Sequence, residues 1–223
     1  MRFRAVACDY DLTLANDGRV SADTIEVVRR GRASGLKIVL VTGRALDDLR
    51  KVFPELSLFD MVVAENGALL FDPVLESEEP LCAPPPEVFL RRLKKRGIPF
   101  AVGRRVVATV RPHENEVLAL LKRTNLKMQI IFNHESVMVL PSGVDKGTGL
   151  SAALTKLGFD PAQIVGIGDA ENDLAFLRLC GFSVAVANAI DLLKRQVDFV
   201  TRSENGAGVA EVIERLIAGA DLP

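Results

Sequence analysis

Short apolar runs alternate with helical stretches at both ends of this chain of 223 residues, and this alternation constrains the fold more than any other feature. Six apolar runs have the length of buried strands: residues 3–9, 37–43, 61–65, 163–169, 182–188 and 198–201. Stretches between them have the signals of helices, as in residues 21–35, where Ser21 or Asp23 is expected to cap the first turn. This alternation predicts an α/β fold, a Rossmann-like core of three layers with a mostly parallel sheet.

The middle of the chain follows a different pattern. Two helical stretches, residues 86–97 and 113–124, are each followed by two strand-like runs around a turn, which contains Arg104 in the first case and His134 in the second. Two helix–hairpin units in a row predict a small α+β domain with an antiparallel sheet.

These patterns divide the chain into two predicted domains. We expect the core to comprise residues 1–79 and 143–223, and the smaller domain to be inserted as residues 80–142. The segment 72–86, which is rich in proline and acidic residues, is interpreted as a linker.

Composition and charge exclude several classes of function. With 28 basic and 29 acidic residues, the chain lacks the excess of positive charge that is typical of proteins that bind nucleic acid or an anionic membrane. No apolar run has the length of a transmembrane helix, and a core strand expected from Phe3 leaves no room for a signal peptide. Cys8, Cys82 and Cys180 lack metal or redox spacing. We therefore expect a cytoplasmic protein that binds neither nucleic acid nor membranes.

Polar residues follow the predicted strands at the points where ligands bind in open parallel sheets. In such sheets, ligands bind beyond the carboxyl ends of the strands. The residues expected to converge there are Asp9, Asp11, Thr42, Gly43, Lys146, Asp169, Asn172 and Asp173.

This set of residue types suits phosphoryl chemistry. Carboxylates at one point repel one another unless a cation lies among them, and oxygen ligands of this kind suit Mg²⁺. A lysine, a threonine hydroxyl and free N–H groups after Thr42 suit a phosphate dianion. One carboxylate can then attack phosphorus, and a second can transfer protons.

Less specific interpretations exist for the same residues. Asp9 and Asp11 alone would fit a solvated turn, and Asp173 alone would fit an exposed helix face. The basic run 91–96 has apolar neighbours at helical spacing, which favours a solvated helix face over a nucleic-acid site. It is the order of the motifs along the chain that favours the catalytic interpretation.

Four motifs, "DYDLT", "TGR", "DKG" and "GDAEND", resemble in this order the motifs of the haloacid dehalogenase (HAD) superfamily of phosphatases. "ENGA", "VAVANA" and the closing "ENGAGVAEVIERL" are similar to its Cof-like, or IIB, subgroup, near the small archaeal phosphoglycolate phosphatases. The inserted middle domain resembles a small type C2 cap. The resemblance covers nearly the whole chain.

The resemblance implies a role for each matching residue. Asp9 would be the nucleophile and a Mg²⁺ ligand, and Asp11 would be the general acid/base and bind Mg²⁺ through its carbonyl. Thr42, Gly43 and Lys146 would bind the phosphoryl group. The remaining residues would complete the metal site and its shell: Asp169 as a ligand, Asp173 directly or through water, and Asn172 at the phosphate or the metal shell.

The chain departs from the family pattern at Leu12, where glycine is most frequent. A leucine at this position predicts a backbone conformation that ordinary residues adopt, and a side chain that narrows the entrance or contacts the cap.

The sequence therefore predicts a Mg²⁺-dependent phosphatase that forms an aspartyl-phosphate on Asp9 and acts on a small phosphorylated metabolite, phosphoglycolate or a sugar phosphate. We expect a monomer or homodimer, with the hairpin turns near Arg104 and His134 contacting the leaving group. A phosphosugar mutase of the same superfamily is the alternative, although the small cap favours hydrolysis. A receiver domain would lack an inserted cap, and a silent phosphosugar-binding protein would not need the intact set of acids.

Overall fold

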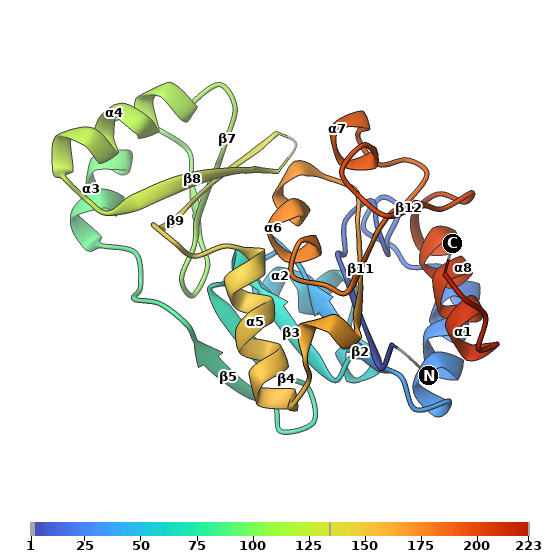
Figure 1. Ribbon diagram of the computed structural model, residues 1–223. Coiled ribbons are helices and arrows are strands. Elements are labelled where there is room, and N and C mark those ends of the chain that lie inside the picture. Colours follow the sequence, from blue (N-terminus) through green and yellow to red (C-terminus); the bar gives the residue numbers. More distant parts are fainter. Residues whose placement is uncertain (1–2, 134, 223) are drawn as a thin grey trace.

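Two β-sheets organise the computed structural model of the protein, which describes residues 3–133 and 135–222 (Figure 1). The larger sheet has the order β12-β11-β10-β1-β2-β3-β4-β5. Its pairs are parallel from β12 to β3, and β4 and β5 are added antiparallel. Its strands are β1 (Ala5–Cys8), β2 (Lys37–Val41), β3 (Met61–Ala64), β4 (Leu69–Asp72), β5 (Ser77–Pro80), β10 (Ile164–Gly168), β11 (Phe182–Ala185) and β12 (Phe199–Val200).

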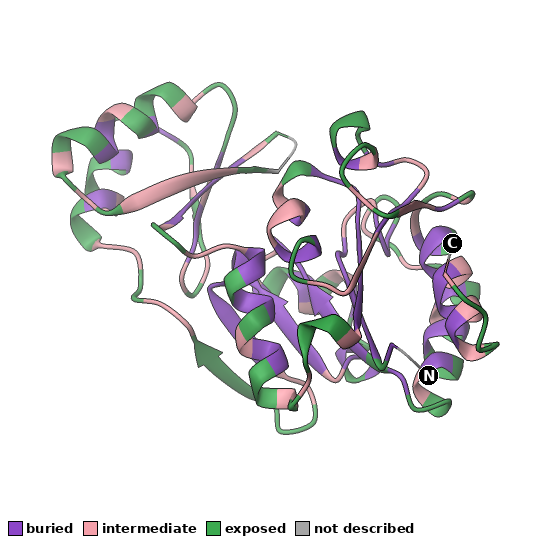
Figure 2. Cartoon of the chain, in the orientation of Figure 1, coloured by how far each residue is buried: buried purple, intermediate pink, exposed green. Residues whose placement is uncertain are grey.

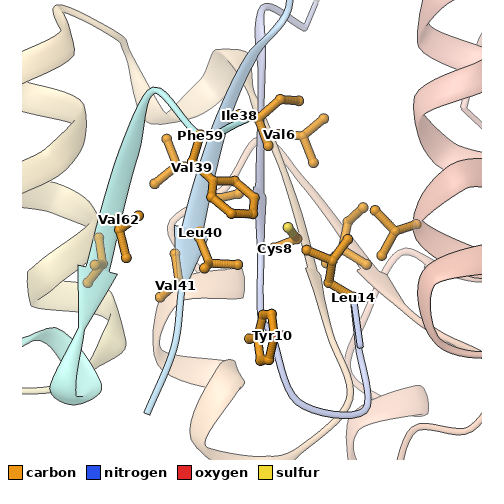
Figure 3. Packing of buried hydrophobic residues seen from close by; sticks show 14 of the residues in the cluster. Val6, Cys8, Tyr10, Leu14, Ile38, Val39, Leu40, Val41, Phe59 and Val62 are labelled. Atoms are coloured by element: carbon orange, nitrogen blue, oxygen red, sulfur yellow. The ribbon is translucent and has the colours of Figure 1, made fainter. Parts of the chain in front are cut away.

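The central strands of this sheet are buried on both faces, as their continuous apolar sequences predict. Figure 3 shows side chains of β1, β2 and β3 packed together, among them Val6, Ile38 and Val62. Each such side chain contributes about 1.5–3 kcal/mol when it is fully buried. The core of the sheet is therefore a rigid support for the loops at its strand ends.

Helices cover both faces of the large sheet and give three layers. α1 and α8 pack against each other on one side, and α5 lies on the other side in contact with α6 (Figure 1). Ser21 caps α1, because its hydroxyl accepts a hydrogen bond from the Thr24 N–H. The helices of this part are α1 (Ala22–Ala33), α2 (Leu46–Val52), α5 (Lys146–Leu157), α6 (Leu174–Leu177), α7 (Asp191–Lys194) and α8 (Asn205–Ile217). The predicted α/β class and mostly parallel sheet are confirmed.

The smaller sheet, which we call the cap sheet, has the order β6-β7-β9-β8, and all of its pairs are antiparallel. Helices α3 and α4 cover one of its faces, where Phe89 of α3 and Leu120 of α4 pack in one cluster with Val139 of the sheet. Met138 and Leu140 pack instead with Ala68 of the core, so the cap sheet lies between its own helices and the core. These elements are β6 (Ala101–Val102), β7 (Val107–Val110), β8 (Met128–Asn133), β9 (Ser136–Pro141), α3 (Glu87–Lys95) and α4 (Glu114–Thr124).

The segment interpreted as a linker, residues 72–86, contains strand β5, which is a correction to the sequence analysis. β5 pairs antiparallel with β4 and is exposed along its whole length (Figure 2). Its acidic and proline residues are typical of an edge strand, where charge and a missing N–H prevent further pairing. The boundaries 80 and 142 of the inserted domain stay a prediction.

One difference from the sequence analysis concerns the segment after Asp169. The helix expected after Asp169 is short, a 3₁₀ turn at Glu171–Asp173 followed by the four residues of α6.

Within the ranges that the structure describes, no helix has both the length and the apolar character needed to cross a membrane.

Candidate active site

Three carboxylates meet at the carboxyl edge of the large sheet. Asp9 follows β1 and Asp169 follows β10, and these strands are parallel neighbours in register at Cys8 and Ile167. Asp173 lies one turn beyond Asp169. One oxygen from each carboxylate lies within 4.8 Å of the others, and all three residues are buried. Parallel pairing thus brings together residues that are more than 150 positions apart.

Lys146 lies among these carboxylates. Its Nζ is 2.6 Å from Asp9 Oδ1 and 2.6 Å from Asp173 Oδ1, and the residue is 1% exposed. Lys146 is the first residue of α5, whose N-terminus Asp145 and Thr148 close with a capping box. The ammonium therefore bridges the ends of two segments that the large sheet already holds close together.

A close approach of two glycines sets the position of α5. A Cβ on Gly149 would lie 2.5 Å from Gly67 Cα, and Gly67 itself has a φ of +94°. The first turn of α5 therefore rests directly on the turn that follows β3, and a side chain at either glycine would push Lys146 away from the carboxylates.

The described part of this cluster holds more acidic groups than basic ones. Burial raises the pKa of Asp9 well above its ordinary value, and the neighbouring charges of Asp173 and Asp169 add to this, while Lys146 opposes it. For Lys146, burial acts against the charged form, but the carboxylates of Asp173 and Asp9 outweigh it and raise the pKa of the ammonium. Among the described residues, three carboxyl groups and one ammonium therefore share a buried volume, in which a further cation would favour the ionised form of Asp9.

The donor set fits a hard divalent cation. Thr13 Oγ1 donates a hydrogen bond of 2.7 Å to Asp169 Oδ1, and the N–H groups of Asp169 and Ala170 donate to Asp173 Oδ2. These contacts orient the carboxylates, and oxygen ligands with excess negative charge suit Mg²⁺. Asn172 Oδ1 is buried and has no hydrogen-bond partner in the described part of the chain, so an acceptor is free beside the cluster.

Asp11 does not join the cluster. Its carboxylate forms a two-point ion pair with Arg44, with Nε to Oδ2 at 2.8 Å and Nη2 to Oδ1 at 2.7 Å. Nη1 of the same guanidinium contacts Asp48 at 2.7 Å. The two acids of the first motif therefore lie in different surroundings, Asp9 with Lys146 and Asp11 with Arg44.

The expectation of an ordinary backbone at Leu12 is wrong. Leu12 has a φ of 58°, in the left-handed region that favours glycine. Its carbonyl accepts a hydrogen bond of 2.7 Å from Asn188 Nδ2, a contact that helps to hold the turn in this conformation. Leu12 is among the residues that line the cleft described below, and a narrowed entrance or a contact with the cap stays a prediction.

Thr42 and Gly43 follow β2, directly before Arg44. Thr42 is fully buried, and its hydroxyl accepts a hydrogen bond of 3.1 Å from the Arg44 N–H. Gly43 lines the cleft beside Arg44. Asn172 Nδ2 donates to Asn66 Oδ1 at 3.3 Å, and Asn172 shares a smaller pocket of about 300 Å³ with Lys146.

A cleft of about 870 Å³ opens between the core loops and the cap sheet. Asp11, Leu12 and Arg44 line its core side, and Gly103 and Arg104 line its cap side. Arg104 Nη1 pairs with Asp47 Oδ2 at 2.5 Å, across the gap between cap and core. His134, the other residue expected at a hairpin turn, lies outside the described residues.

Three residues of this region received no role from the sequence: Thr13, Arg44 and Glu65. All belong to motifs that were recognised, "DYDLT", "TGR" and "ENGA". Their places in these motifs could have marked them as candidates for the site. Their partners could not be predicted, because they lie elsewhere in the chain, at Asp169, Asp11 and the hairpin before β7.

Comparisons with known proteins show which family this sequence matches. The family model of haloacid dehalogenase-like hydrolases matches residues 6–82 and 108–213. Phosphoglycolate phosphatase 2 of Saccharolobus solfataricus is 30% identical over 224 residues, which cover 96% of this chain and 92% of that protein.

Two solved structures have the same fold. The crystal structure of Thermoplasma acidophilum 0175 superposes with a TM-score of 0.81 at 22% identity, covering 96% of this chain and 97% of the other. A sugar phosphatase of HAD subclass IIB, BT4131, gives a TM-score of 0.76 at 21% identity, covering 96% and 98%.

Proposed function

The chain belongs to the haloacid dehalogenase-like hydrolases and is a phosphatase of phosphoric monoesters, and from this premise we propose that it is a Mg²⁺-dependent enzyme with Asp9 as nucleophile. One observation carries the proposal: the Asp9 carboxylate is buried at a strand end, 2.6 Å from the Lys146 ammonium and beside two further carboxylates. A nucleophile, a phosphate-binding cation and a metal site are thereby available within one small volume.

The proposed reaction has two steps. A carboxylate oxygen of Asp9 attacks phosphorus, the bond from phosphorus to the leaving oxygen breaks, and that oxygen takes a proton from Asp11. Water then loses a proton to Asp11 and attacks the aspartyl-phosphate, which restores the Asp9 carboxylate and releases inorganic phosphate. Asp11 must therefore be protonated before the first step and is protonated again at the end, so its ion pair with Arg44 has to open before the reaction begins. Its place at the cleft supports this exchange with leaving group and solvent.

The remaining residues bind and orient the phosphoryl group. Lys146 would neutralise its charge, and the Thr42 hydroxyl and Gly43 N–H would hold its oxygens. Asn172, with its free acceptor, would contact the phosphate or the metal shell. The metal residues would be Asp9, Asp169 and Asp173 with the Asp11 carbonyl. When bound, Mg²⁺ supplies positive charge for the carboxylates and the phosphoryl oxygens.

We propose a small phosphorylated metabolite as substrate, with phosphoglycolate first and sugar phosphates second. The relative from Saccharolobus solfataricus bears the name phosphoglycolate phosphatase, and BT4131 is described as a sugar phosphatase. Arg44 lines the core side of the cleft, and a guanidinium matches the carboxylate of a glycolate leaving group, which would replace Asp11 as its partner when the substrate binds.

The proposed setting is the cytoplasm, with the enzyme acting as a monomer or homodimer. Cys8, Cys82 and Cys180 are free thiols, which suits a reducing compartment. Burial raises the pKa of the Cys180 thiol to about 12, which disfavours its thiolate form.

A panel of phosphate monoesters tests the proposed function. Phosphoglycolate, several sugar phosphates and p-nitrophenyl phosphate are incubated with enzyme and Mg²⁺, and inorganic phosphate is measured. We expect release from all classes, with kcat/KM highest for phosphoglycolate. No release from any ester would contradict the proposal, and transfer of phosphate to a second position of a sugar without release would indicate a mutase.

A further inference from the structure

Glu65 is a buried acid that the proposed reaction does not use. It follows β3 in the core, and its side chain is 0% exposed. Its carboxylate accepts three hydrogen bonds from main-chain N–H groups of the cap: from Arg104 at 2.7 Å, Arg105 at 2.6 Å and Val106 at 3.0 Å. These three donors are consecutive residues of the hairpin between β6 and β7. A buried carboxylate of the core thus holds one segment of the cap.

The turn that carries Glu65 has an unusual backbone. Glu65 has a φ of 55° and Asn66 a φ of 53°, and residues other than glycine are found in this region mainly where the surroundings determine their conformation. The Glu65 N–H donates to the Arg44 carbonyl and the Asn66 N–H to the Thr42 carbonyl, each at 3.0 Å. Glu65 is therefore tied to the loop that carries Thr42 and Arg44.

The hairpin fits closely around this carboxylate. A Cβ on Gly103 would lie 2.6 Å from Glu65 Oε1, nearer than any real Cβ contact. Gly103 does not have a positive φ, so its small size, rather than its conformational freedom, is what this contact requires. The same hairpin forms part of the cap side of the cleft, through Val102, Gly103 and Arg104, while Asp11 and Arg44 line the core side.

We propose that Glu65 is a positioning residue that fixes the β6–β7 hairpin over the cleft and thereby sets which leaving groups the enzyme accepts. The proposal rests on the phosphatase activity proposed above. The side chain of Glu65 binds the hairpin, and its main chain binds the loop that carries Thr42 and Arg44. Glu65 therefore fixes the position of the hairpin relative to this loop. Hydrogen bonds to a charged acceptor are stronger than neutral ones, so three of them on one buried group hold the hairpin in a single place.

The Glu65→Gln variant tests this role. A glutamine offers one acceptor oxygen, and its NH₂ group faces N–H donors instead of accepting from them. We expect the ratio of kcat/KM for phosphoglycolate to that for p-nitrophenyl phosphate to change by about tenfold, because charged hydrogen bonds of the hairpin are lost. Glu79→Gln, which removes an equal charge from an exposed acid paired with Lys156, is the matched control and should leave the ratio unchanged.

Hydrogen exchange provides a readout that does not depend on substrate. The amides of Arg104, Arg105 and Val106 should exchange faster in Glu65→Gln than in the wild type, and those of β1 should not change. If the wild type hydrolyses no ester, the proposed function fails, while the exchange result still reports on the contact itself.

A second variant protects the test against failure of Glu65→Gln to fold. Gly103→Ala keeps the Glu65 carboxylate but forces the hairpin away from it, so it should change the substrate ratio in the same direction. An unchanged ratio in Gly103→Ala, or an equal loss for every ester in Glu65→Gln, would overturn the assignment, since both results would limit Glu65 to supporting the fold.

Discussion

The two sides of the candidate site are built differently. On the phosphoryl side, Asp9, Lys146, Asp169 and Asp173 are buried, lie at the ends of paired strands or helices, and contact one another directly. On the leaving-group side, the cleft is lined by residues of the core and of the cap, which range from the buried Met138 to the exposed Arg104, and Glu65 and Arg104 link the two parts through hydrogen bonds and ion pairs. A buried cluster suits chemistry that all substrates share, whereas a cleft formed by two separate parts of the chain suits the choice among substrates.

Glu65 links the two sides. It belongs to the core by sequence and hydrogen bonding of its main chain, yet its carboxylate binds the cap. The comparison therefore predicts that changes to the phosphoryl side abolish the reaction for every ester, and that changes to the cleft alter the order of preference among esters.

Removal of divalent metal should have the largest effect. With three carboxylates around one ammonium, the phosphoryl side needs added positive charge before a phosphate dianion can bind. We expect excess EDTA to abolish hydrolysis of every ester and Mg²⁺ to restore it. Mg²⁺ binding measured by calorimetry should be lost in Asp169→Asn, and full activity in chelator would contradict the metal assignment.

Arg44→Ala should have an intermediate effect that depends on the ester. If the guanidinium receives the leaving-group carboxylate, its loss should lower kcat/KM for phosphoglycolate by roughly 10–100-fold more than for p-nitrophenyl phosphate, the range expected for a charged hydrogen-bonding pair. Steady-state kinetics on both esters measure this difference. An equal loss on both would show that Arg44 acts only through Asp11, its partner in the structure.

Arg104→Ala should have the smallest effect and serves as a comparison for Arg44. Its side chain is 40% exposed, its guanidinium pairs with Asp47 and Glu78, and exposed pairs contribute about 0–1 kcal/mol. We expect a change of a few-fold, different from one ester to another. A loss as large as that of Arg44→Ala would show that both sides of the cleft bind the leaving group equally.

Much of the buried cluster could be predicted from the sequence because strand order and strand ends determine it. Asp9 and Asp169 converge since both follow buried parallel strands, and Lys146 joins them as the first residue of a helix. The pairing of Asp11 with Arg44 could not be predicted, because it depends on side-chain direction within a turn that Leu12 adopts with a positive φ.

The contacts between the core and the cap could not be predicted from the sequence, for another reason. Glu65 binds main-chain N–H groups, which every residue except proline possesses, so no residue pattern in the hairpin marks them. β5 was missed because its acidic and proline residues are typical of linkers as well as of edge strands.

The division of roles between Asp9 and Asp11 is the central claim, and a rapid-quench experiment with p-nitrophenyl phosphate tests it most directly. The nitrophenolate leaving group needs no proton, so Asp11→Asn should still phosphorylate Asp9 and should then release phosphate about 10²–10⁴-fold more slowly than the wild type. The account predicts a burst of nitrophenolate, stoichiometric with enzyme, in Asp11→Asn and none in Asp9→Asn, which lacks the nucleophile. A burst in Asp9→Asn alone, or equal residual turnover in both variants, would contradict it.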